Sequence, residues 1–271
     1  MIALTDELLR GWPLPFPDGG DKEERGRVLL IAGSREIAGA AMLAGDAALR
    51  AGAGKLTVAT EASVAPIVAL AIPEARVVGL ERAAEFAERA DAVLIGPGMT
   101  DAADLVRSLL PRLRKIPLVL DACAMDVVHD KGMRFESPVL LTPHAGEMAR
   151  LTGLDKEQVA ANQADLASEW AGRWNAIVAL KGAITFVASP GGDAWRHDGG
   201  SIGLAISGSG DTLAGIIAGL AARGATLEQA VAWGVRLHAR AGERLESRMG
   251  PLGFLAREIP AEVPALMREM S

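Results

Sequence analysis

The chain has 271 residues, a mass of 28.2 kDa and a formal net charge of −6, and half of its residues are apolar. This length and composition predict a folded chain with a sizeable core and exclude an intrinsically disordered one. The acidic balance and the absence of Tyr argue against a nucleic-acid binder, which needs basic patches and aromatic stacking surfaces.

Short apolar runs alternate with helical stretches along most of the chain. We expect strands at Arg27–Ala32, Leu56–Ala59, Ala75–Val78, Ala92–Ile95, Leu118–Leu120 and Val139–Leu141. We expect helices at Ala38–Ala51, Ser63–Ala71, Ala83–Arg89, Asp101–Leu113, Gly146–Leu151 and Lys156–Gly172. Because the apolar runs do not alternate with polar residues, they are typical of parallel strands buried on both faces. The pattern predicts a three-layer α/β/α fold with a mostly parallel, doubly wound sheet.

The two ends of the chain follow a different pattern. Met1–Arg10 is expected to be a short helix, and the prolines of Trp12–Asp18 predict an extended segment, so residues 1–26 form an N-terminal lead-in. After Trp174, three runs separated by glycine-containing turns predict hairpins at one edge of the sheet: Ala176–Leu180, Ile184–Ala188 and Ala194–His197. Three helices are expected to follow, at Asp211–Arg223, Leu227–Leu245 and Phe254–Met267. With no linker or shift in composition, residues 1–271 are expected to form a single domain.

Several features bear on the cellular location. No segment reaches the roughly 18 apolar residues of a membrane span. Asp6 and Glu7 stand where a signal peptide carries basic residues, and Cys123 is the single cysteine, so no internal disulfide forms. The sequence predicts a cytoplasmic protein that does not associate with membranes or nucleic acid.

The turn Ser207–Asp211 is the strongest local feature, because an almost wholly apolar helical stretch follows it. Free amides and the positive dipole end of such a helix form an anion site suited to phosphate. Asp211 at this position is either a general base or only a helix N-cap. The chain lacks both the Gly-x-Gly-x-x-Gly spacing after its first apolar strand and a P-loop, which disfavours a standard NAD dehydrogenase and a P-loop nucleotidase.

Taken together, the glycine-containing stretches resemble the ADP-dependent (S)-NAD(P)H-hydrate dehydratases, a branch of the ribokinase-like superfamily. The matching stretches, in the family's order, are Gly33-Ser34, Ala38–Ala41, Ala48–Gly54, Gly96–Gly98, Leu120–Ala122, Thr142–Glu147, Lys181–Thr185 and Gly208–Gly215. The resemblance implies phosphoryl transfer from ADP, or from ATP, to the hydroxyl of NADH hydrate or NADPH hydrate, followed by loss of phosphate. The products are NAD(P)H, AMP and phosphate. The resemblance also implies Mg²⁺ and a homo-oligomer.

The resemblance also implies roles for individual residues. Asp211 is expected to be the catalytic base and to contact the hydrate. The rest of the hydrate site is expected at Ala40, Gly98 and His144. The anion hole is expected at the amides of Gly208, Ser209 and Gly210. The nucleotide is expected to contact Lys181, Gly182, Ala183, Ile184, Thr185 and Gly210. Glu147 is expected to support Mg²⁺ through water.

Simpler readings of the same residues stay open. A structural role alone could explain each candidate. His144 and Asp121 could merely cap a helix, and Glu147 could be a first-turn residue that the helix dipole favours. Lys181 could be a solvated lysine of a hairpin. The sequence also departs from the family that it resembles. Cys123 stands where members often carry a second acid that could help to bind metal. Arg35–Ile37 stands where they often carry an aromatic residue.

Two other functions fit the same pattern. A kinase of a small alcohol on the same fold would use Asp211 and the same anion hole, and a nucleotide sensor would keep the fold without turnover. Residues before 27 are too few for an epimerase-type domain, so the expectation is a stand-alone dehydratase.

Overall fold

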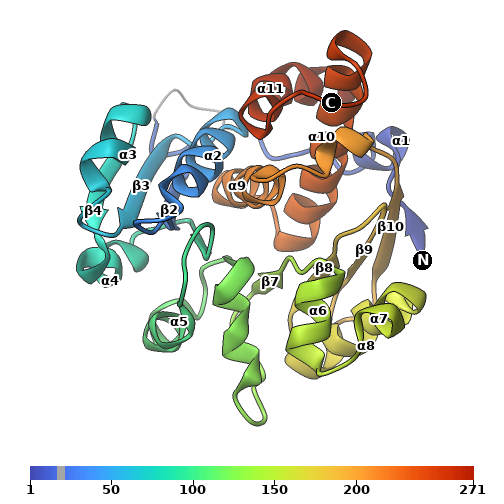
Figure 1. Cartoon of the computed structure of the whole chain (residues 1–271), viewed down its shortest axis with the longest axis horizontal. Coiled ribbons are helices and arrows are strands. Elements are labelled where there is room, and N and C mark those ends of the chain that lie inside the picture. The colour runs from blue at the N-terminus through green and yellow to red at the C-terminus, as the bar shows by residue number, and fades with distance from the viewer. Residues whose placement is uncertain (17–21) are drawn as a thin grey trace.

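One ten-stranded sheet organises the computed structural model, which describes residues 1–16 and 22–271 (Figure 1). Its strands are β1 (Ile2–Ala3), β2 (Arg27–Ile31), β3 (Lys55–Thr60), β4 (Arg76–Gly79), β5 (Ala92–Ile95), β6 (Leu118–Leu120), β7 (Val139–Leu141), β8 (Ile177–Leu180), β9 (Ile184–Ala188) and β10 (Ala194–Asp198). Their order in the sheet is β1-β10-β9-β8-β7-β6-β5-β2-β3-β4. Neighbouring strands from β8 to β4 are parallel, and β8, β9 and β10 are antiparallel.

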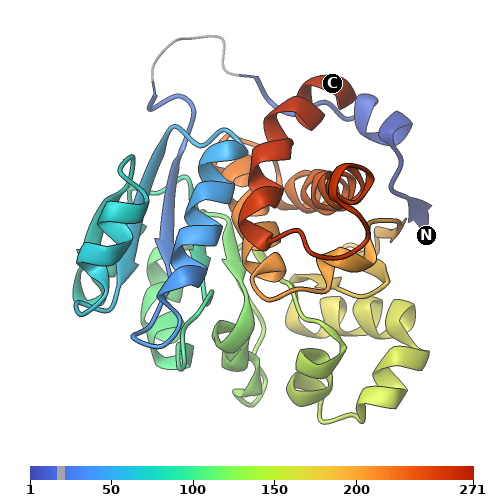
Figure 2. The same ribbon diagram turned by 45° about the horizontal axis from the view of Figure 1, so that its top comes forward.

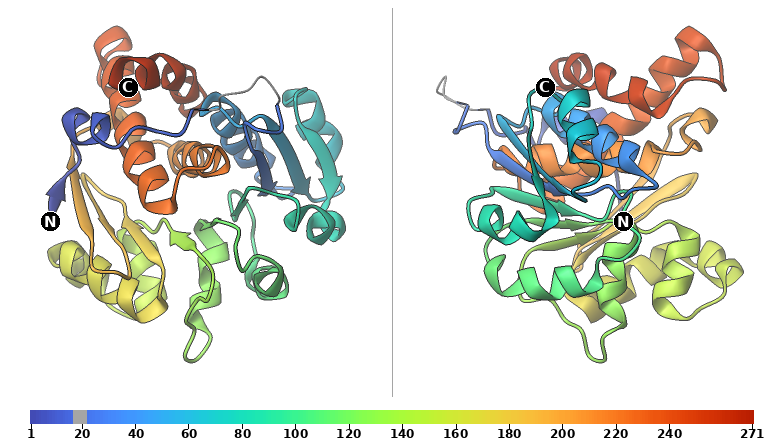
Figure 3. Two further views of the ribbon diagram at one scale, coloured as in Figure 1. Left: turned by 180° about the vertical axis from the view of Figure 1, so that it is seen from behind. Right: turned by 60° about the vertical axis from the view of Figure 1, so that its left-hand side comes forward.

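Helices cover both faces of this sheet (Figures 1 and 3). They are α1 (Asp6–Arg10), α2 (Ala38–Arg50), α3 (Ala65–Ala71), α4 (Ala83–Ala87), α5 (Ala103–Leu109), α6 (Ala145–Thr152), α7 (Lys156–Ala161), α8 (Gln163–Trp174), α9 (Ser209–Ala222), α10 (Leu227–Met249) and α11 (Ile259–Met270). Successive strand residues point to opposite faces. Val28 and Leu30 therefore pack with α2, α9, α10 and α11, whereas Leu29 and Ile31 pack with α4 to α8. The predicted three-layer α/β/α fold is confirmed.

The first turn of α9 differs from the sequence expectation. The helix begins at Ser209, two residues before the predicted start, and its N-cap is Gly208 with φ +89°. This backbone conformation favours glycine, and a Cβ here would also require the Leu43 side chain to move, because it would lie 2.4 Å from Leu43 Cδ1. Asp211 is thus the third helical residue, and its reading as an N-cap is wrong.

Three other boundaries also differ from the predictions. A break at Asn162 divides the predicted helix Lys156–Gly172 into α7 and α8, and the predicted helix at Phe254 begins only at Ile259, after a 3₁₀ turn. The first ten residues contain β1 as well as α1, and β1 pairs in parallel with β10. The hairpin strand β10 is therefore not the edge of the sheet. A two-residue strand is too short to show a periodic pattern.

The N-terminal lead-in is held against α10. Trp233 Nε1 donates to Trp12 O at 2.8 Å, and Gln229 Nε2 donates to Pro13 O at 2.8 Å. The Trp12 ring stacks on that of Trp195 in β10 at 6.1 Å between centroids. Figure 2 shows α1, near the N-terminus, beside α10 and α11. Residues 17 and 18, the end of the extended segment predicted at Trp12–Asp18, lie outside the described residues. Within the part of the chain that the structure describes, no helix is long and apolar enough to cross a membrane.

Helix α9 packs on α2 with almost no side chain between the two backbones. A Cβ at Gly215 would lie 2.2 Å from Ala44 O, and one at Gly219 would lie 2.4 Å from Ala48 O. Only glycine allows this approach. The contact fixes α9, and with it the first turn that carries Asp211, over the centre of the sheet.

We predict that Gly215→Ala lowers the free energy of unfolding by about 1–3 kcal/mol, because the added methyl forces the two helices apart. The matched control is Gly172→Ala in α8, where a Cβ meets nothing within 4 Å. This control should raise the free energy of unfolding by about 0.5–1 kcal/mol, because alanine favours the helix. Urea denaturation measures both values, and two changes of the same sign would contradict the close approach of the helices.

Candidate active site

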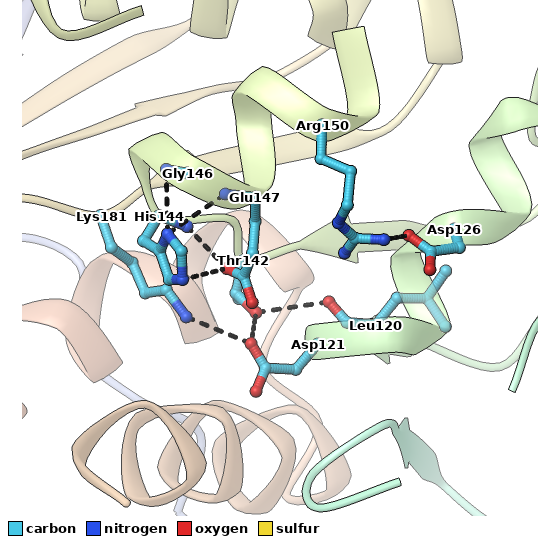
Figure 4. Close-up of polar contacts among 9 residues, drawn as sticks. All are labelled: Leu120, Asp121, Asp126, Thr142, His144, Gly146, Glu147, Arg150 and Lys181. Carbon is cyan, nitrogen blue, oxygen red and sulfur yellow. Dashed lines mark hydrogen bonds and ion pairs between the residues drawn. The ribbon is translucent and has the colours of Figure 1, made fainter. Parts of the chain in front are cut away.

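The carboxyl ends of β6, β7 and β8 bring three polar residues together (Figure 4). Asp121 follows β6, and its Oδ1 accepts hydrogen bonds from Thr142 Oγ1 at 2.6 Å and from Lys181 Nζ at 3.2 Å. Asp121 and Thr142 are buried, and the Lys181 side chain is 18% exposed. The reading of Lys181 as a solvated lysine is therefore wrong. Asp121 is the N-cap residue of the 3₁₀ helix Ala122–His129, but its side chain makes no capping hydrogen bond there and instead contacts Thr142 and Lys181.

Our candidate site did not include Asp121. The signal that could have found it is an acidic residue directly after a fully buried strand, because parallel strands place such residues side by side at one edge of the sheet. The sequence shows this position but not its partners, which come from stretches 21 and 60 residues further along the chain.

Lys181 stays charged at this site. Burial by itself would lower the pKa of Lys181, but the negative charges of Asp121, Glu147 and Asp211 outweigh it, and the net result is a raised pKa. The ammonium also lies beside α9, since a Cβ at Gly210 would be 3.4 Å from Lys181 Nζ. A permanent positive charge thus sits at the positive end of a helix dipole, which favours an anion.

Only part of the predicted anion hole has free amides. Ser209 N donates to Ile206 O at 3.2 Å, and Thr212 N begins the helical pattern by donating to Gly208 O at 3.1 Å. Within residues 1–16 and 22–271, the amides of Gly208, Gly210 and Asp211 have no such partner. The free donors of the first turn are therefore those of Gly210 and Asp211, with Gly208 at the cap.

Asp211 has the most strongly perturbed carboxyl of the site. Burial raises the pKa of Asp211 to about 7, and the negative charge of Asp121 acts in the same direction, whereas Lys181 opposes the shift. A carboxyl with a pKa near neutrality can accept a proton from a bound hydroxyl at physiological pH.

His144 and Glu147 form a reciprocal cap at the start of α6. His144 Nδ1 accepts from the amides of Gly146 at 3.0 Å and Glu147 at 3.2 Å, and Glu147 Oε2 accepts from His144 N at 2.8 Å. The helix-capping reading of both residues is thus confirmed. Because Nδ1 accepts, the neutral ring carries its proton on Nε2, and the side chain is 60% exposed. This Nε2 lies 3.7 Å from Glu147 Oε2 (Figure 4).

Gly98 and Ala40 meet at the point where the strand order reverses, between β2 and β5. Gly98 has φ +66°, and a Cβ there would lie 2.6 Å from Ala40 Cβ and 2.5 Å from Ile37 O. Gly33 N donates to Pro97 O at 2.8 Å and ties the two loops together. Ligands of open α/β sheets bind in such crevices.

The five consecutive residues expected to hold the nucleotide do not form one cluster. Lys181 faces Asp121, whereas Gly182 and Ala183 lie exposed in the turn between β8 and β9. Ile184 and Thr185 begin β9 and are half-buried.

The described residues include no group of three or more His, Cys, Asp or Glu side chains that could hold a metal ion. Cys123 Sγ donates to Met99 O at 3.2 Å, and burial raises the pKa of the thiol to about 11. Glu147 has one carboxylate oxygen outside its capping bond. With this single carboxylate oxygen as the protein donor, the site fits Mg²⁺ that is held mainly by water and by phosphate oxygens.

A family model described as NAD(P)H-hydrate dehydratase matches residues 28–265. The chain belongs to this family. It is 51% identical to an ADP-dependent (S)-NAD(P)H-hydrate dehydratase of Xanthomonas campestris, over 98% of this chain and 96% of that protein. Relatives described as bifunctional NAD(P)H-hydrate repair enzymes also match, and the chain spans about half of their length.

Solved structures of this family have the same fold. An ADP/ATP-dependent NAD(P)H-hydrate dehydratase of Bacillus subtilis, co-crystallised with ATP and Mg²⁺, superposes with a TM-score of 0.88 at 33% identity over 100% of this chain and 99% of that one. A ribokinase-like superfamily protein of Enterococcus faecalis superposes with a TM-score of 0.88 at 30% identity, over 100% and 96% of the two chains. The predicted ribokinase-like fold is confirmed.

We predict that Asp211→Asn raises the melting temperature at pH 8. Folding raises the pKa of Asp211 from 3.8 to about 7, so the folded chain retains a proton that the unfolded chain releases. Stability therefore falls as the pH rises through this interval, and asparagine removes that loss. At pH 4 the difference between the variant and the wild type should nearly vanish.

The matched control is Asp165→Asn, because Asp165 is the exposed third residue of α8, as Asp211 is the third residue of α9. Loss of its favourable interaction with the helix dipole should lower stability slightly. Calorimetry from pH 4 to pH 8 measures both variants. A lower melting temperature of Asp211→Asn at pH 8 would contradict the cost assigned to the buried charge.

Proposed function

We infer that this chain dehydrates the S-hydrates of NADH and NADPH in an ADP-dependent reaction that yields NAD(P)H, AMP and phosphate. Membership of the family and the 51% identical relative that carries this activity in its name support the inference. The observation that carries it is the first turn of α9. Here Asp211, with a pKa of about 7, adjoins free amides and the Lys181 ammonium.

In the proposed reaction, ionised Asp211 accepts the proton of the hydrate hydroxyl. The hydroxyl oxygen attacks the β-phosphorus of ADP, and the bond from that phosphorus to the bridging oxygen breaks, so AMP leaves with the electron pair. The Gly210 amide and the Lys181 ammonium stabilise the charge on the transferred phosphoryl group. In the second step the carbon–oxygen bond breaks and phosphate leaves. The neighbouring ring carbon loses a proton to the departing phosphate, and the electron pair of the broken carbon–hydrogen bond forms the double bond.

The remaining expected residues have separate parts in this proposal. Gly98 and Ala40 leave room for the nicotinamide ring, because neither carries a side chain beyond Cβ. The Nε2–H of His144, which lies 3.7 Å from Glu147 Oε2 on a side chain that is 60% exposed, would donate to a polar group of the hydrate. The β8–β9 turn that begins after Lys181 lies beside the nucleotide, together with Gly210.

Mg²⁺ and the phosphoryl donor are part of the same proposal. Glu147 would support Mg²⁺ through water, and the ion would neutralise phosphate charge during transfer. ADP or ATP is the proposed donor, in line with the ADP/ATP-dependent relative of Bacillus subtilis. A cytoplasmic homo-oligomer stays a prediction.

The deciding experiment incubates the full chain with NADH hydrate, Mg²⁺ and either ADP or ATP, and follows reduced-nicotinamide absorbance and the nucleotide products. We expect NADH, AMP and phosphate with ADP, and a rate that rises with pH through about 7 as Asp211 ionises. Asp211→Asn should keep nucleotide affinity and lose turnover by about 10²–10⁴-fold. A stable phosphorylated product would indicate a kinase instead, and ADP binding without any product would indicate a sensor.

The space beside Gly210 gives a second prediction. Gly210→Val places two methyl groups beyond Cβ at the free amides and Lys181, so nucleotide affinity and turnover should both fall by at least about 10-fold. The matched control is Gly210→Ala, whose Cβ would lie 3.4 Å from Lys181 Nζ and therefore fits. Calorimetric titration with ADP measures the affinities. Equal affinity of the valine and alanine variants would contradict an anion site at this turn.

A further inference from the structure

His238 of α10 lies behind the first turn of α9 and is not among the residues that the sequence analysis selected. Its Nε2 lies 3.1 Å from Ser209 O and 3.0 Å from Ser209 Oγ. The buried Thr212 donates from Oγ1 to the same carbonyl oxygen at 2.7 Å. Two side chains, one of them from a neighbouring helix, thus converge on one backbone carbonyl at the start of α9.

The Ser209 carbonyl and the Gly210 N–H belong to the same peptide unit. A hydrogen bond to the carbonyl oxygen draws electron density toward it and makes the N–H of that unit a stronger donor. The Gly210 N–H is a free amide at the positive end of α9, beside Lys181. Whatever contacts Ser209 O therefore acts on the proposed anion hole through a single peptide bond.

The His238 ring is a neutral donor in this arrangement. An imidazole nitrogen that faces a carbonyl oxygen must carry the proton, so Nε2 is protonated and Ser209 Oγ can share that hydrogen. Burial lowers the pKa of His238 to about 4, and the positive charge of Lys181 acts in the same direction. The ring is therefore uncharged at neutral pH and does not compete with Lys181 for an anion.

We propose that His238, with Thr212, holds and polarises the Ser209–Gly210 peptide, so that the Gly210 N–H is fixed as a donor to the transferred phosphoryl group. The proposal rests on the phosphoryl transfer proposed above. His238 acts through the backbone of another residue and is a positioning residue. Because charge on the phosphoryl oxygens grows during the transfer, the effect should be larger in kcat than in KM.

The test compares variants of the full chain. His238→Met removes the donor and keeps much of the bulk, His238→Gln keeps an N–H near the place of Nε2, and Thr212→Val removes the second donor. The matched control is His129→Met, since His129 Nε2 also lies 3.1 Å from a carbonyl oxygen, that of Arg150, but away from α9. The readouts are kcat, the KM for ADP and the amide resonance of Gly210 in selectively labelled protein.

We expect His238→Met to lower kcat about three- to tenfold, the loss of one hydrogen bond, with a KM change below about twofold. It should also shift the Gly210 amide proton upfield. His238→Gln should restore most of both values, and His129→Met should change neither. An unmoved Gly210 resonance in His238→Met, or equal losses in the methionine and glutamine variants, would overturn the proposal.

Two further outcomes keep the test decisive. If His238→Met does not fold, the Thr212→Val variant tests the proposal, because it removes the other donor to the Ser209 carbonyl oxygen. The Gly210 amide proton should then also move upfield, and an unmoved resonance would overturn the proposal. A wild-type chain without dehydratase activity would overturn the proposed function instead. The Gly210 resonance would then still decide on His238, since it needs no turnover.

Discussion

The ion pair between Asp121 and Lys181 is the interaction on which the electrostatics of the site depends. It is largely buried, and Thr142 supplies the second hydrogen bond to the Asp121 carboxylate. A buried ion pair is costly to disturb, because removal of either partner leaves a charge without compensation. The pair keeps the lysine charged where phosphate is expected, and the charge of Asp121 adds to the effect of burial in raising the pKa of Asp211. The Asp121 carboxylate thus affects both the positively charged Lys181 ammonium and the Asp211 carboxyl that is proposed as the base.

The backbone of α9 is held as firmly as these side chains. Gly215 and Gly219 let it pack on the backbone of α2, and Gly208 provides the left-handed N-cap that turns the chain into the helix. His238 and Thr212 contact its first turn from α10 and from α9 itself. Donors aimed at a developing charge are effective only when they are fixed before the reaction, because moving them costs free energy at each turnover. The close packing of α9 meets this requirement.

Several residues serve stability and the site together. His144 and Glu147 cap α6 through one nitrogen and one carboxylate oxygen, and each keeps its other polar atom for additional contacts. Cys123 contacts the Met99 carbonyl as a protonated thiol. The Mg²⁺ proposed for this site would be held by water and phosphate oxygens more than by protein carboxylates.

The sequence by itself determined the layers, the parallel strands from β2 to β8, and the glycine-rich turn at the start of α9, because each rests on periodicity or on local turn chemistry. It missed β1, the break at Asn162 and the two-residue earlier start of α9, since a two-residue strand and a helix end have weak local signals. It proposed Asp211 as the base and Lys181 as a nucleotide contact, but not that Asp121 pairs with Lys181 or that His238 lies behind them. Only the tertiary structure decided that Asp121, Lys181 and His238 converge there. Strand order and helix packing set those contacts across tens of residues, and burial, which shifts the pKa of Asp211, exists only in the folded chain.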